Sequence, residues 1–142
     1  MSGFVFDELA ADDASWIAEL PMGIDDVDSL FDALSEVMQF PDYFGRNWDA
    51  LDECICDLCW LPPGDIALLH KDLPLKNDLH GLKLYLSILS DAVENWSKGE
   101  SNFMSLYGVE NLDVRNGVRH RNFNVVFPAG YRESVLKTMA NL

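Results

Sequence analysis

Hydrophobic and polar positions vary along the chain in a way that predicts strands separated by helices. Three segments have the length and composition of β-strands: residues 15–20 (SWIAEL), 66–70 (IALLH) and 122–127 (NFNVVF). The middle segment is an almost continuous apolar run, which is typical of a parallel strand covered on both faces. We therefore expect residues 66–70 near the centre of a sheet.

Apolar residues recur at helical spacing between the first two of these segments. Residues 27–38 form a clear amphipathic pattern, and Asp25 or Asp26 can cap its start. A second helix is predicted from residue 48 to about residue 60, with Asn47 as its N-cap and a Pro-Pro-Gly stop after it.

The second half of the chain adds a long helix over about residues 82–96 and a helical segment from Tyr131 that should pack back onto the domain. The pair Asn116-Gly117 could turn a hairpin that adds an antiparallel edge strand. Strands that alternate with helices predict an α/β layered fold with right-handed crossovers.

Length and composition fit one soluble domain. With 142 residues, of which 49% are hydrophobic, the chain can bury a sizeable core. We expect a single domain over residues 1–142, with its core at about 15–128 and a C-terminal helical extension at 129–142. The start MSGFVFDELAADD lacks the basic and apolar regions of a secretory signal, and no run of about 18 apolar residues could span a bilayer. A cytoplasmic location is therefore expected.

The negative charge lies in the first half of the chain. The net charge is −14. Residues 1–70 contain 16 acids and one base, Arg46, which gives −15, whereas residues 71–142 contain eight acids and nine bases, which gives +1. Such a charge distribution repels nucleic acid and anionic membranes, and it attracts basic proteins or cations. A purely solubilising role remains an alternative reading.

The second predicted helix has one acidic face. At about 100° per residue, its four carboxylates fall within an arc of roughly 140°, and they belong to Asp49, Asp52, Glu53 and Asp57. The opposite arc is apolar and is expected to face the core. No Lys or Arg follows at i+3 or i+4 to pair these carboxylates. The pattern favours a docking face for a cationic cleft on another protein, although a surface can also tolerate such repulsion without a function.

Three aromatic residues lie beside this acidic face, and aromatic residues often anchor interface centres. They are Tyr43, Phe44 and Trp48. Trp48 lies near the apolar arc, so we expect it in the core. Tyr43 is the better candidate for a partner contact.

The stretch FPDYFGRNWDALDECI, residues 40–55, resembles the signature of the barstar family, intracellular inhibitors of secreted guanyl-specific ribonucleases. The family pattern of Pro, acid, Tyr, aromatic, Gly, any residue, Asn, large apolar, Asp, Ala and Leu falls on residues 41–51. The preceding DDVDSLFDALSEVMQ resembles the family's first helix. Close similarity spans about residues 15–60, with weaker agreement through residues 66–70.

This resemblance implies a barstar-like three-layer fold, in which a three-stranded parallel sheet is packed by helices. It also implies that the loop and the second helix plug a ribonuclease active site. By position, the family's inhibitory surface corresponds to Tyr43, Gly45, Asn47, Asp49 and Glu53. Two positions depart from the family: Glu53 stands where Asp is typical, and Asp52 stands where the best-known member has an aromatic residue.

The sequence thus predicts a protein inhibitor of a ribonuclease, of the immunity or antitoxin type, that is not an enzyme and needs no cofactor. Its carboxylates would occupy phosphate positions in the cationic cleft of a basic ribonuclease or ribonuclease toxin. The predicted partner-binding residues are Tyr43, Phe44, Gly45, Asn47, Asp49, Asp52, Glu53 and Asp57. The alternative is an acidic adaptor or nucleic-acid mimic that binds another basic protein.

Metal-dependent chemistry is weakly indicated. The spacing of Cys54, Cys56 and Cys59 suggests a metal site, but on a continuous helix Cys54 and Cys59 would face inward and Cys56 nearly opposite. An odd number of clustered cysteines favours reduced thiols. The acidic helix could also hold Mg²⁺ as a hydrolase does, but the sequence has no glycine-rich phosphate loop beside it.

The histidines and the late basic cluster give no catalytic pattern. His70 and His80 have no flanking nucleophile in a recognisable motif, so we expect structural or exposed roles for them. The cluster Arg119-His120-Arg121 is expected at a solvated strand edge.

Overall fold

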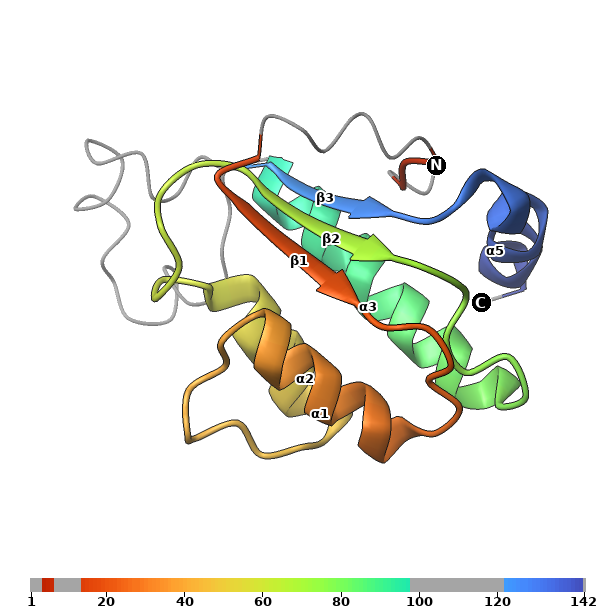
Figure 1. The fold of residues 1–142 in the computed structure, drawn as a ribbon, viewed down its shortest axis with the longest axis horizontal. Helices are drawn as coiled ribbons and strands as arrows, with labels where there is room; N and C mark the ends of the chain where they lie inside the picture. Colours follow the sequence, from red (N-terminus) through yellow and green to blue (C-terminus); the bar gives the residue numbers. More distant parts are fainter. Residues whose placement is uncertain (1–3, 7–13, 98–121, 142) are drawn as a thin grey trace.

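The computed structural model describes residues 4–6, 14–97 and 122–141. Its sheet contains β1 (Trp16–Leu20), β2 (Ile66–His70) and β3 (Phe123–Val126) in the order β1-β2-β3, and both pairings are parallel (Figure 1). The three predicted strands and the central position of residues 66–70 are confirmed. The α/β class with a three-stranded parallel sheet is confirmed with them.

The predicted helices are also confirmed, with small differences at their ends. They are α1 (Val27–Val37), α2 (Trp48–Asp57), α3 (Leu79–Ser97) and α5 (Arg132–Ala140), and a short 3-10 helix, η2 (Ala129–Tyr131), precedes α5. Helix α2 ends at Asp57 rather than at about Trp60, because Leu58 has a left-handed backbone with a φ of 48°.

Both predicted N-caps form. The Asp26 carboxylate accepts the Ser29 N–H at 2.7 Å at the start of α1. The Asn47 side-chain oxygen accepts the Ala50 N–H at 2.8 Å at the start of α2. Each cap satisfies an N–H group that has no partner within its own helix.

The main core lies between one face of the sheet and the helices. Alternate strand residues are buried on this face, namely Ala18, Leu20, Ile66, Leu68, Phe123 and Val125. Leu34 of α1, Ile55 of α2 and Leu86 of α3 belong to the same cluster and are fully buried. In Figure 1, α1 and α2 lie together beyond β1, and α3 crosses behind the sheet.

The opposite face of the sheet carries a smaller cluster. Ala67 and Val126 are buried there, and Leu69 is half-buried against them. Because residues 66–68 are buried on both faces, the expectation of a covered central strand is confirmed. The small cluster contains no helix residue from the described ranges. The described residues therefore contribute two of the three layers expected from the sequence, the sheet and one layer of helices.

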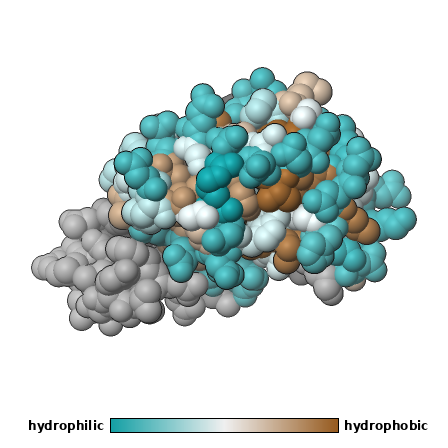
Figure 2. Space-filling model, turned by 90° about the horizontal axis from the view of Figure 1, so that it is seen from below, coloured by the Kyte–Doolittle hydropathy of each residue, from teal (hydrophilic) through white to brown (hydrophobic). Residues whose placement is uncertain are grey.

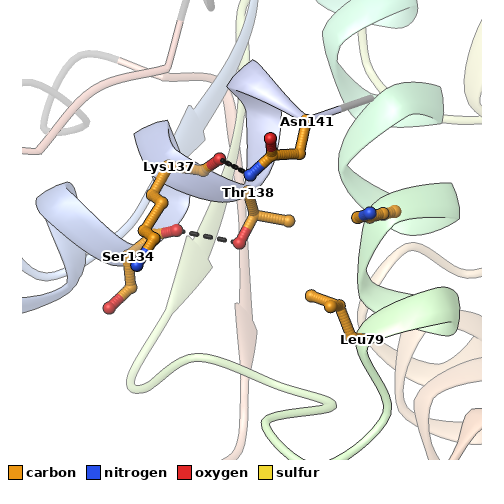
Figure 3. A pocket seen from close by; sticks show the side chains of 6 residues that line it. Leu79, Ser134, Lys137, Thr138 and Asn141 are labelled. Carbon is orange, nitrogen blue, oxygen red and sulfur yellow. Dashed lines mark hydrogen bonds between the residues drawn. The ribbon is translucent and has the colours of Figure 1, made fainter.

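The C-terminal helix packs back onto the domain, as predicted. Val135 of α5 is fully buried in the main core. A hollow of about 260 Å³ lies between the start of α3 and α5, and it is lined by Leu79, Lys83, Ser134, Lys137, Thr138 and Asn141 (Figure 3). Thr138 and Asn141 donate hydrogen bonds to backbone carbonyls of α5 itself. The hollow shares no residue with the acidic loop and helix.

Some predictions lie outside the described residues. These are the hairpin at Asn116-Gly117 and the basic cluster Arg119-His120-Arg121. The division of residues 1–142 into one domain with an extension stays a prediction. Among the described helices, none is long and apolar enough to cross a membrane.

A buried polar cluster joins the ends of β2 and β3 to α3. His70 Nδ1 lies 3.0 Å from the Val126 carbonyl oxygen, and Nε2 lies 2.7 Å from the Tyr85 hydroxyl oxygen. Because a carbonyl only accepts, Nδ1 of the neutral ring carries the hydrogen, and Nε2 accepts the Tyr85 O–H. Burial lowers the pKa of His70 to about 4 and raises the pKa of Tyr85 well above its usual value. His70 is therefore structural, and His80 is exposed.

Candidate functional site

The loop between α1 and α2, residues 39–47, rests on a cluster of aromatic rings. The Phe44 ring lies 4.9 Å from the Phe40 ring and 5.7 Å from the Phe31 ring, between centroids. The Trp48 ring lies 5.2 Å from that of Phe31. Trp48 packs against the core as predicted, and Phe44 is half-buried beside it. These contacts hold the loop from its inner side.

Two indole groups fix the point where the loop leaves α1. Trp16 donates its N–H to the Val37 carbonyl at 3.0 Å, and Trp60 donates its N–H to the Met38 carbonyl at 2.9 Å. The last turn of α1 has no basic residue to interact with these carbonyls. The indoles therefore satisfy acceptors that a helix end leaves without partners.

Three residues of the predicted partner surface lie exposed on the outer side of the loop. They are Tyr43, Gly45 and Asn47, and Tyr43 has 67% of its surface exposed. Asn47 also caps α2, so its side-chain oxygen is engaged within the fold while the residue stays accessible. Gly45 and Asn47 lead directly into the start of α2, whereas the Tyr43 hydroxyl reaches Asp57 in the last turn of the helix.

The carboxylates of α2 divide into exposed, half-buried and buried groups. Asp49 and Glu53 are exposed one helical turn apart, and Asp52 is half-buried. In the described part of the chain, no Lys or Arg forms an ion pair with Asp49 or Glu53. These two side chains therefore face outward, as expected, and no basic residue in the described part of the chain pairs with them.

Arg46 is the basic residue closest in sequence to the carboxylates of α2, but its side chain points toward α1. Its guanidinium binds the carboxylates of Asp28 and Asp32, with nitrogen–oxygen distances of 3.3 and 2.5 Å. These contacts, led by the Asp32 hydrogen bond, raise the pKa of Arg46. The backbone of Arg46 has a φ of 55°, a left-handed conformation that residues other than glycine rarely adopt. Arg46 therefore neutralises acids of α1 and leaves those of α2 without it.

The outward position expected for Asp57 is wrong. Only 8% of its surface is exposed, and its carboxylate accepts the Tyr43 O–H at 3.2 Å and the Cys59 N–H at 3.3 Å. Burial of the hydroxyl, followed by the Asp57 charge and hydrogen bond, raises the pKa of Tyr43 to about 12. Asp57 lies in the last turn of α2, and these hydrogen bonds come from the loop before the helix and from the residue two positions after it, so the helical wheel alone does not describe its surroundings.

The expected orientation of the cysteines is also wrong. Cys54 is buried as predicted, but Cys56 is buried too, and Cys59 is exposed because it lies beyond the end of α2. None of the three forms a disulfide bond. Burial raises the pKa of Cys54 to about 11 and that of Cys56 to about 12. Within the described ranges, no group of three or more His, Cys, Asp or Glu side chains is placed to hold a metal ion.

The side of the molecule that carries α1 and α2 is mainly hydrophilic, with a band of hydrophobic residues between polar ones (Figure 2). Helix α1 contributes further exposed acids, which are Asp28, Asp32 and Glu36. Exposed acids therefore lie on both helices, and the predicted partner surface uses those of α2 together with the loop.

The family model that matches the chain is Barstar (barnase inhibitor), and it covers residues 21–108, more than half of the sequence. The chain belongs to the barstar family. No curated protein and no solved structure matches the chain. The matched range contains α1, the loop and α2, so the acidic surface lies inside the barstar-like part of the chain.

One residue of this barstar-family surface is electrostatically strained. Burial, then the neighbouring Asp91 carboxylate of α3, raises the pKa of Asp52, and Asp49 and Glu53 add to the effect. The Cys56 thiol opposes it by donating to the Asp52 carboxylate at 3.8 Å. Ionised Asp52 is therefore less favourable in the folded chain than in the unfolded one.

Asp52→Asn should stabilise the free protein at pH 7 by on the order of 0.5 kcal/mol, because the amide keeps the shape and removes a repelled charge. A raised folded-state pKa makes wild-type stability grow as the pH falls through that pKa, since protonation then favours the folded chain. The advantage of the variant should shrink toward pH 4. Urea denaturation of both proteins at pH 7 and pH 4 measures the difference. A variant less stable at pH 7 would contradict the account.

Sequence reasoning missed the contribution of α3 to this barstar-like site. Trp96 donates its indole N–H to the Ile55 carbonyl of α2 at 2.8 Å, and Asn95 lies beside Cys56. Asp91 adds its charge next to Asp52. The helical spacing around residues 82–96 gave a signal for α3, but not for which residues of α2 it would meet.

Proposed function

We propose that this barstar-family protein is an inhibitor of a ribonuclease, of the immunity or antitoxin type, and that it acts in the cytoplasm. In this proposal the acidic loop and α2 enter the cationic active site of a basic ribonuclease and block it. The observation that carries the proposal is the exposed pair Asp49 and Glu53, beside exposed Tyr43, with Arg46 bonded elsewhere.

The chemistry of the target supports this role. A ribonuclease cleft needs cationic side chains to hold phosphate and to stabilise developing charge. Two carboxylates one helical turn apart, about 5 Å along the axis, can take the place of phosphate groups in such a cleft. Tyr43 would fill a neighbouring apolar or base-binding site. Inhibition then results from occlusion, and the inhibitor needs no cofactor and performs no reaction.

Gly45 gives independent support for a contact surface. A Cβ added there would lie 3.5 Å from both the Ala50 Cβ and the Asn47 Nδ2, which is ordinary van der Waals contact, and its φ is not in the left-handed region. The free fold therefore does not require glycine at this exposed position. A partner surface that approaches the backbone closely would require it.

The charge distribution favours rapid association. The −15 charge of residues 1–70 would steer a basic partner at rates of about 10⁸–10⁹ M⁻¹s⁻¹ at low salt. Such speed suits an inhibitor that must reach the enzyme before the enzyme reaches RNA.

Capture followed by an RNA-cleavage assay tests the proposal. Tagged chain should retain a basic protein from cells that contain its partner, and that protein should cleave RNA until the chain is added in equimolar amount. The chain alone, with Mg²⁺ or Mn²⁺, should leave RNA intact. A retained basic protein without RNA-cleaving activity would overturn the ribonuclease assignment and favour the acidic adaptor instead.

A further inference from the structure

Tyr43 combines high exposure with a fixed hydroxyl group. The residue has 67% of its surface exposed, yet its O–H donates to the Asp57 carboxylate, 14 residues further along the chain. An exposed tyrosine without such a bond samples several side-chain rotamers. The bond ties the tip of the side chain to the end of α2, so it restricts both torsions of Tyr43.

Asp57 is placed where a carboxylate needs donors. It lies in the last turn of α2, the negative end of the helix dipole, and that turn contains no basic residue. It is also more than nine-tenths buried, so water solvates it little. Its two oxygens instead accept from Tyr43 and from the Cys59 N–H. The carboxylate and the tyrosine therefore stabilise each other's position.

We propose that Asp57 is a positioning residue of the partner-binding surface, holding the exposed Tyr43 ring in its binding orientation before a partner arrives. This inference rests on the proposed function, because it takes Tyr43 to be a contact. It assigns to Asp57 a role different from that of the exposed acids: Asp57 acts through Tyr43 and does not itself enter the partner's cleft. A ring that is already ordered loses less conformational entropy on binding.

The free protein provides a test that needs no partner. Nuclear magnetic resonance couplings should show one dominant χ1 rotamer for Tyr43 in the wild type and averaging over rotamers in Asp57→Ala. Asp91→Ala is the matched control, because it removes an exposed carboxylate that lies next to Asp52 of α2 and has no hydrogen bond to Tyr43. This control should keep the wild-type rotamer. Averaging over χ1 rotamers of Tyr43 in the wild type, or one dominant rotamer in Asp57→Ala, would overturn the proposal.

A double-mutant cycle with the ribonuclease gives the second test. Tyr43→Phe removes only the hydroxyl and should weaken binding about fivefold, and Asp57→Ala should weaken it about tenfold. The double variant should lose about tenfold rather than the fiftyfold of independent effects, because both changes break the same bond. Asp91→Ala combined with Tyr43→Phe should instead be additive.

The outcomes separate this proposal from the proposed function. Full additivity of Tyr43→Phe and Asp57→Ala would show that the hydroxyl contacts the partner directly or that Asp57 acts by its charge, and either result overturns the positioning role. If no ribonuclease binds, the proposed function fails, and the rotamer measurement still decides whether Asp57 orders Tyr43. Denaturation of each variant confirms that the compared proteins are folded.

Discussion

Replacing Asp49 and Glu53 together with alanine should abolish tight inhibition of the proposed ribonuclease partner while the chain stays folded. Each single substitution should weaken binding by more than about 2 kcal/mol, roughly 30-fold. The loss is large because each change leaves cationic groups of the cleft buried without a counter-ion in the complex. Titration of ribonuclease activity with each variant measures the inhibition constant.

The same variants should not be less stable on their own. Asp49 and Glu53 are exposed, and removing either relieves repulsion from the other acids of α2. Glu36→Ala is the matched control, because it removes an exposed helical acid from α1 rather than from α2. It should reduce binding by less than about 0.5 kcal/mol. A ribonuclease still fully inhibited by the double variant would refute the assigned surface.

Acidification should destabilise the protein through His70. Its pKa is about 4 in the folded chain, against an ordinary value of 6.5. Below pH 6.5 the imidazole of His70 becomes protonated in the unfolded chain but stays neutral in the folded chain. The stability present at pH 7 is therefore lost as the pH falls from 6.5 toward 4. The full loss is about 3 kcal/mol, and the slope approaches about 1.4 kcal/mol per pH unit within this window.

Variants isolate this titration from that of the many acids. His70→Gln removes the titrating ring, so its free energy of unfolding should fall less steeply between pH 6.5 and 4 than that of the wild type. Tyr85→Phe keeps the buried imidazole and removes the hydrogen bond to Nε2, so it should cost stability at pH 7 and keep the wild-type slope. Urea denaturation across this pH range gives the slopes. Equal slopes for wild type and His70→Gln would rule out His70 as the acid-sensitive group.

Periodicity predicted the elements of this fold well because it reports which residues are buried. The apolar run of residues 66–70 identified the central strand, and helical spacing identified α1, α2 and α3. The end of α2 was less predictable. Leu58 ends the helix in a left-handed backbone conformation, which glycine usually adopts at such ends. Because leucine stands there instead, the sequence contains no glycine that would predict the end of the helix.

The site was predictable where it depends on local sequence and unpredictable where it depends on distant partners. The cap at Asn47 and the exposure of Asp49 follow from residues within one helical turn. The burial of Asp57 does not, because its tyrosine partner comes from another part of the chain. The pairing of Arg46 with α1 likewise depends on how the loop folds back.

The loop between α1 and α2 points its two kinds of residue in opposite directions. Phe40 and Phe44, with Trp48 at the start of α2, pack against interior rings, whereas Asp42 and Tyr43 face the solvent. In the proposed inhibitor, mutations on the solvent side can change which ribonuclease is bound without disturbing the hydrophobic anchor. The architecture therefore allows new target specificities to evolve, or to be engineered by randomising only the outer positions, on an unchanged scaffold.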